Sequence, residues 1–147
     1  MQKPLEISAS DEVMAMIAGF RRTEDARFSP DGRRVAVAGF ARDCLFVLDV
    51  DLSCAAEDRV VHIRGCQTVS CRALREPHGL DFIDADHVAV ANRKGRVTLL
   101  PLPAPITGTA NHAIRAIRQI RGGFFSAVRS PGSIAVDDNA YGQRTLI

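Results

Sequence analysis

The sequence predicts an all-β chain made of repeated four-stranded units, with one short helix near its N-terminus. The first observation is a pair of apolar residues that precedes a turn three times, at intervals of 54 residues: Ala26 and Phe28, Leu80 and Phe82, Ile134 and Val136. The second is the string VAVA, which occurs in the strand after each of the first two turns. Self-similarity at a fixed period indicates stacked or radially arranged units.

The helix is predicted in a lead-in segment, residues 1–22, that precedes the repeats. Ser10 is a good N-cap residue, and Asp11 and Glu12 would lie in the first turn, where the helix dipole favours negative charge. Gly19 is suited to ending the helix. We therefore expect a short helix between Ser10 and Gly19.

The first unit, residues 23–74, contains four expected strands. After Phe28, the tetrapeptide SPDG favours a type I turn, since Pro suits its second position and Gly its last. Three further strands are expected where apolar residues alternate or run together, over residues 34–39, 45–50 and 59–65.

The second unit, residues 75–128, repeats this order, with strands expected before the turn after Phe82 and over residues 87–92, 96–102 and 114–122. The last of these is ambiguous, because isoleucines recur there every third residue and Asn111 and Gly122 could cap a helix. The repeat register favours a strand. An incomplete third unit, residues 129–147, ends in RTLI, which could form a second strand.

Four short strands per unit at a period of about fifty residues are typical of β-propeller blades. FSPDGRRVAVAG and LFVLDVD resemble the repeats of YVTN-type surface-layer proteins and WD-like propellers. PHGLDFIDADHVAVANRKGRVTLLPL and RSPGSIAVDDN resemble NHL and gluconolactonase-like blades. The resemblance covers residues 23–147 and implies a partial propeller of about two and a half blades. Because such motifs specify geometry and hardly any chemistry, we expect a non-enzymatic binding or assembly module.

This architecture predicts a set of residues buried between blade faces. They are the apolar pairs and the valines of the VAVA strands: Phe28, Leu80, Phe82, Ile134, Val136, Val35, Val37, Val88 and Val90.

So few blades cannot close a ring, since propellers generally have about four to eight. An open array leaves strand edges unpaired, and these invite pairing with another chain. We expect self-association through the C-terminal edge strand, or further blades missing from this chain, and a different protein partner would also fit such an edge. An open stack capped by the helix is the third alternative.

Glu24 and His78 are the candidate catalytic or metal-binding residues. They are 54 residues apart and take equivalent positions in two units, with Gly132 in the third. In a propeller these positions line the central channel, where a carboxylate and an imidazole could hold a divalent metal or exchange protons. His78 in the context PHG resembles streptogramin-lyase-like and amidating-lyase-like propellers, which implies a metal-dependent six-bladed lyase or lactonase-like enzyme as the alternative function. Since a third ligand is missing, we favour binding over catalysis.

Two further features bear on binding. Asn92 and Arg93 are candidates for the channel rim, although an Asn at a strand end more often shapes a turn. Arg115, Arg118 and Arg121 form a basic stripe, which suggests RNA binding of the NHL type as a second alternative. The single Tyr, the lack of Trp and a net charge of only +2 argue against nucleic acid.

The composition of the chain also limits which cellular compartment and which cofactors we expect. No segment approaches the roughly 18 apolar residues that span a bilayer, and the N-terminal residues lack the apolar core of a secretory signal. We therefore expect a cytoplasmic protein without membrane association, whose cysteines are free thiols. Cys66 and Cys71, with His62 upstream, lack the second ligand pair of a structural zinc site, so no cofactor is predicted.

Overall fold

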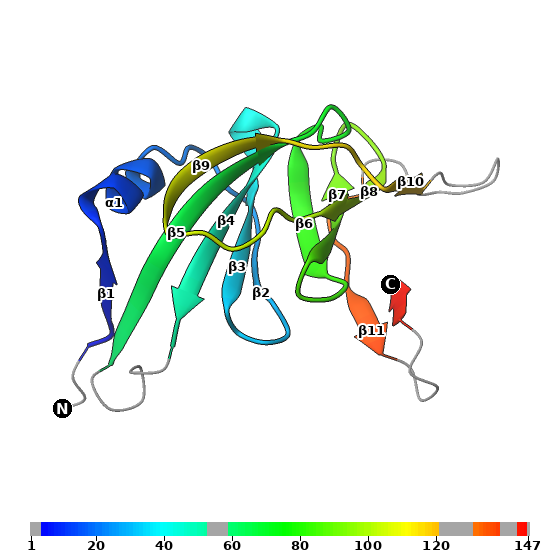
Figure 1. Ribbon diagram of the computed structural model, residues 1–147. Coiled ribbons are helices and arrows are strands. Elements are labelled where there is room, and N and C mark those ends of the chain that lie inside the picture. Colours follow the sequence, from blue (N-terminus) through cyan, green and yellow to red (C-terminus); the bar gives the residue numbers. More distant parts are fainter. Residues whose placement is uncertain (1–3, 53–58, 121–130, 139–143, 147) are drawn as a thin grey trace.

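The computed structural model describes residues 4–52, 59–120, 131–138 and 144–146 (Figure 1). These residues are mostly β, with one α-helix and three sheets, none of which closes on itself. The prediction of a β-rich chain with a short N-terminal helix is confirmed. Within the same residues, no helix reaches the length and apolarity that crossing a membrane requires.

The first sheet is an antiparallel meander with two additions at its outermost strand. The meander comprises β2 (Ala26–Phe28), β3 (Arg34–Gly39), β4 (Cys44–Asp51) and β5 (Val60–Ser70). The additions, β1 (Glu6–Ala9) and β9 (Gly108–Ala113), both pair in parallel with β5. They cover successive stretches of the same β5 edge, because β1 ends opposite Ile63 and β9 begins opposite Gly65.

The sequence analysis missed both additions. β1 lies in the lead-in segment, and β9 lies within residues 75–128 but pairs with the first sheet. The β9 sequence, GTANHA, has no apolar alternation, and its side chains are exposed or half-buried. Its position depends on backbone pairing with β5, which no local sequence pattern reports.

The helix α1 (Asp11–Ala18) forms where it was predicted. The Ser10 hydroxyl accepts a hydrogen bond from the Val13 N–H at 3.3 Å, and the Gly19 N–H donates to the carbonyls of Ala15 and Met16. Val13 is fully buried in a cluster with Val50, Ile63 and Cys66. The helix therefore covers one face of the first sheet at its outer strands.

The second sheet has the strand order β10-β8-β7-β6. Its strands are β6 (Pro77–Phe82), β7 (His87–Asn92), β8 (Val97–Pro101) and β10 (Arg118–Ile120). β7, like β3 in the first sheet, has the predicted bounds. β10 resolves the ambiguous segment in favour of a strand over its three residues, whereas residues 121 and 122 lie outside the described residues.

The third sheet consists of β11 (Val136–Asp138) and β12 (Arg144–Leu146), which pair antiparallel. The predicted second strand in RTLI is thus confirmed for residues 144–146.

The core lies between successive sheets (Figure 1). One face of β3 and β4 packs against one face of the second sheet through a cluster of apolar residues: Ala36, Ala38, Leu45, Val47, Val69, Leu74, Leu80, Phe82, Val88, Val90, Leu100 and Leu102. The other face of the second sheet, with Ala89 and Ala91, packs against Ile134 just before β11. The sheets are therefore layered in chain order.

The predicted core is correct in the second sheet and at Ile134, which precedes β11, and it is wrong at Phe28. Leu80, Phe82, Val88, Val90 and Ile134 are buried, whereas Phe28 is 57% exposed. Val35, Val37 and Val136 are half-buried. Among the described residues, α1 covers this face of the first sheet only over the outer strands, which leaves Phe28 on β2 exposed.

Candidate functional site

Glu24 and His78 lie next to each other in the structure. Glu24 precedes β2 and His78 lies in β6, and the distance from Glu24 Oε2 to His78 Nε2 is 3.6 Å. Both side chains are largely shielded, with 19% and 23% of their surfaces exposed. The two residues that the spacing singled out therefore meet where the first and second sheets adjoin.

Two further contacts orient the His78 ring. Its Nδ1 lies 2.6 Å from the carbonyl oxygen of Gly132, and its Nε2 lies 3.1 Å from Nη2 of Arg93. A carbonyl only accepts and a guanidinium only donates, so Nδ1 carries the hydrogen and Nε2 accepts. His78 thus connects Glu24 and Arg93 to the backbone that leads into the third sheet.

We expect NMR to find the neutral ring of His78 in the Nδ1–H form, because Gly132 can only accept from it. Two-bond proton–nitrogen spectra at mildly alkaline pH distinguish the two tautomers, with His78→Gln used to assign the signals. Arg93→Ala should leave this tautomer unchanged, because the bond to Gly132 remains. An Nε2–H ring in the unsubstituted protein would contradict the geometry.

Arg22 and Phe40 complete the cluster, and the sequence analysis assigned a role to neither. Arg22 Nε donates to Glu24 Oε1 at 2.5 Å, and the guanidinium lies 4.2 Å from the centre of the Phe40 ring. The Phe40 ring in turn meets His78 edge-on at 6.4 Å. The one available signal was the spacing of Arg22 and Glu24, since residues two apart in an extended segment point to the same side.

This arrangement is poorly suited to holding a metal. Arg22 and Arg93 place two positive charges on the atoms of Glu24 and His78 that would bind a cation. In the part of the chain that the structure describes, no group of three His, Cys, Asp or Glu side chains is placed to share a metal ion. The bond from Arg93 also occupies the Nε2 lone pair that a general base would need. The cluster joins the first two sheets and the segment that leads into the third.

Asn92, predicted with Arg93 to lie at the channel rim, is fully buried and is bonded both to the turn that follows it and to the backbone before β6. Its Oδ1 accepts from the Arg75 N–H at 2.9 Å. Its Nδ2 donates to the carbonyl of Arg96 at 2.6 Å and to the hydroxyl of Thr98 at 3.2 Å. Asn92 thus shapes the connection between β7 and β8, while Arg93 reaches the His78 cluster.

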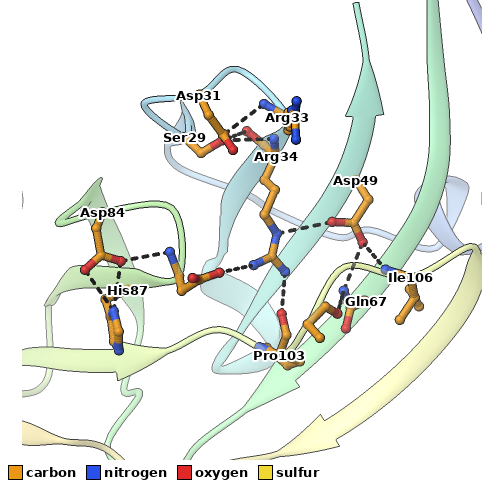
Figure 2. Close-up of polar contacts among 12 residues, drawn as sticks. Ser29, Asp31, Arg33, Arg34, Asp49, Gln67, Asp84, His87, Pro103 and Ile106 are labelled. Atoms are coloured by element: carbon orange, nitrogen blue, oxygen red, sulfur yellow. Dashed lines mark hydrogen bonds and ion pairs between the residues drawn. The ribbon is translucent and has the colours of Figure 1, made fainter.

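A second polar cluster lies inside the fold (Figure 2). Arg34 on β3 and Asp49 opposite it on β4 have side chains only 3% and 7% exposed, and Arg34 Nε donates to Asp49 Oδ1 at 3.1 Å. Arg34 Nη2 also donates to the carbonyl of Pro103 at 2.7 Å. Asp49 Oδ2 accepts from Gln67 Nε2 and from the Ile106 N–H, both at 3.0 Å. This network fastens the connection between β8 and β9 to the first sheet.

The cysteines considered for zinc are not assembled into a site. Burial raises the pKa of the Cys66 thiol to about 11, with a further contribution from Asp49, so this thiol is protonated at neutral pH. Cys66 lies in the cluster beneath α1, and Cys71 packs at the edge of the core between the first two sheets. Their side chains thus belong to different packing clusters.

Comparison of the chain with protein-family models, curated proteins and solved structures finds no match. A functional proposal for this chain therefore rests on the geometry of its own residues.

Proposed function

We propose that the chain is a partial β-propeller that works as a non-enzymatic assembly module, with a second copy of itself as the partner. The observation that carries this proposal is the contrast between two phenylalanines 54 residues apart. Phe82, in the second sheet, is 4% exposed beneath the first sheet, whereas Phe28 in the first sheet is 57% exposed. Phe28 therefore lies on the face that, in the second sheet, receives another sheet.

The neighbours of Phe28 support this comparison. Phe28 pairs with Val35, and Val35 pairs with Leu48, so all three side chains lie on one face. Val35 and Val37 are half-buried, while Val88 and Val90 in the second VAVA strand are fully buried. Phe28 and the valines beside it thus form an apolar surface at β2, next to the part of the face that α1 covers, where a partner sheet could pack.

The junctions between the sheets support the propeller architecture. Asp25 Oδ2 accepts a hydrogen bond from the Leu80 N–H at 3.1 Å, and Asp81 Oδ2 accepts one from the Val136 N–H at 2.8 Å. Both bonds join residues 55 apart and run from the first strand region of one sheet to that of the next. The second bond is displaced by two residues from the 54-residue repeat, which keeps its residues on the same face of the strand. Radially repeated blades are expected to repeat such contacts.

The second copy is the preferred occupant because the layers follow one another in a single direction. We call the face of a sheet that packs against the following sheet its forward face, and the face that packs against the preceding sheet its backward face. Each junction joins one forward face to one backward face. The face of Phe28 is a backward face without a partner sheet among the described residues, and the third sheet of another copy can supply a forward face. Such a head-to-tail contact builds rings or filaments.

Light scattering coupled to size exclusion tests the proposal. We expect the protein at high micromolar concentration to exceed the 15.9 kDa of one chain. Phe28→Asp should weaken self-association by about 30-fold, which corresponds to the 2 kcal/mol typical of a central aromatic contact. Ile117→Asp is the matched control, because Ile117 is 58% exposed and lies just before β10 of the second sheet; it should leave the assembly unchanged.

Thr145→Pro tests the other side of the same contact. Thr145 lies in β12, where Pro removes one N–H and disfavours the strand. It should weaken the same assembly, while circular dichroism shows that the variants stay folded. A well-folded monomer at high micromolar concentration would overturn the proposal.

A further inference from the structure

A groove of about 820 Å³ lies at the outer rim of the first two sheets, and the self-association surface does not include it. Two segments line it: residues 70–73, which begin at the last residue of β5, and residues 113–116 with Gln119, which lead from the end of β9 into β10. In Figure 1 the chain follows this course along the upper edge, from β9 to β10. A volume of this size falls in the range of about 300–1,000 Å³ found for ligand sites.

The lining is apolar with cationic side chains at its margin. Its apolar part consists of Cys71, Ala73, Ala113, Ile114 and Ala116, and its charged side chains are Arg72 and Arg115. The surrounding residues 70–75 and 111–120 contain four arginines and no acidic residue. None of these four arginines forms an ion pair within the described residues. The groove thus has positive charge without internal compensation.

A strand edge without a partner among the described residues adjoins the groove. β10 pairs with β8 on one side and is the end strand of its sheet in the part of the chain that the structure describes. Ile117 and Ile120, just before β10 and at its end, are 58% and 37% exposed. An edge strand offers unpaired N–H and C=O groups to an extended chain, and neighbouring pockets then select its side chains.

We infer that this groove and the β10 edge bind an extended acidic peptide segment of a partner protein, with apolar side chains alternating with carboxylates. Apolar side chains fit the alanine and isoleucine lining, while the arginines pair with the carboxylates. RNA would also meet the positive charge, but among the described residues that line the groove there is no aromatic side chain on which a base could stack. Charge and apolar surface together favour the peptide.

Fluorescence anisotropy with three labelled probes tests this inference. The probes are an octapeptide of alternating Val and Glu, the same peptide with Lys in place of Glu, and a single-stranded oligouridylate. We expect the Val-Glu peptide to bind at least about tenfold more tightly than the Val-Lys peptide, as electrostatic complementarity requires. The Arg72→Glu/Arg115→Glu double variant should lose about tenfold or more of that affinity by the same argument.

Two variants separate the contribution of charge to peptide binding from the contribution of the groove's shape. Ala113→Trp fills the groove without changing its charge and should also weaken binding of the Val-Glu peptide. Arg33→Glu makes the same kind of charge change at the opposite end of the first sheet, beside the turn before β3. It should change the affinity for the Val-Glu peptide by no more than about twofold, because a distant charge is screened by salt.

The outcomes distinguish peptide binding at the groove from self-association through Phe28. Phe28→Asp should bind the peptide normally, whether or not the protein self-associates. Oligouridylate binding that depends on Arg72 and Arg115, without peptide binding, would overturn the inference and assign the groove to RNA. Failure of the Val-Glu peptide to bind, or binding that survives Ala113→Trp and the double variant, would also overturn it.

Discussion

Replacing Phe82 with Ala is expected to lower the free energy of unfolding by about 3–5 kcal/mol, as large truncations of core aromatics do. Phe82 is 4% exposed and packs in the cluster between the first two sheets, together with Leu80, Val88 and Leu100. The cavity would open at the junction of two layers, where neither sheet can move without breaking contacts along its whole face. Urea denaturation followed by circular dichroism measures the loss.

Phe28→Ala is the matched control, because it removes the same side chain 54 residues earlier in the sequence. With Phe28 57% exposed, the change should cost less than about 1 kcal/mol at dilute, monomeric concentration. Equal losses at the two positions would contradict the burial of Phe82 between the layers. A loss below about 1 kcal/mol for Phe82→Ala would contradict it as well, since that is the level of surface changes.

Local patterns predicted most of the meander correctly. β3 and β7 begin and end at the predicted residues, because Val and Ala alternate through both strands and turn residues precede them. β5 extends five residues beyond its predicted end, to Ser70. Its last residues pair with β4 on one side and β9 on the other. Those partners are distant in sequence, so the extension is invisible to any local pattern.

The repeat spacing predicted which candidate residues would become neighbours, but not what they would do together. Glu24 and His78 meet as their equivalence implies. The chemistry of the pair is set by Arg22 and Arg93, which occupy the same atoms. Which way an arginine side chain points depends on tertiary packing, so the sequence supported a metal or proton-transfer alternative that this charge distribution disfavours.

The exposure of Phe28 shows where sequence equivalence fails. A repeat assigns the same face to Phe28 and Phe82, and that assignment holds, but burial also requires a neighbouring layer. The second sheet has such a layer in the first sheet, while the first sheet has, within the described ranges, only α1 over its outer strands. The mistaken core residue is therefore the one that marks the proposed assembly surface.

Replacing Arg34 with Met is expected to cost about 3–5 kcal/mol, the penalty for breaking a buried ion pair by removing one partner. Asp49 would stay 7% exposed or less in its pocket, with only the uncharged Gln67 amide and the Ile106 N–H to stabilise its charge. The bond from Arg34 to the carbonyl of Pro103 would be lost too, which loosens the connection between the second sheet and β9. Chemical denaturation of the variant gives the size of the effect.

Arg64→Met provides the control, since Arg64 pairs with Asp51 on the same sheet but is 62% exposed, and an exposed pair contributes about 0–1 kcal/mol. The double variant Arg34→Met/Asp49→Leu should be more stable than Arg34→Met alone, because it removes the unpaired charge together with its partner. If Arg34→Met were no more damaging than Arg64→Met, the buried network would not be what fastens residues 103–106 to the first sheet. A double variant less stable than Arg34→Met would instead assign the stabilisation to the bonds of Asp49 with Gln67 and Ile106.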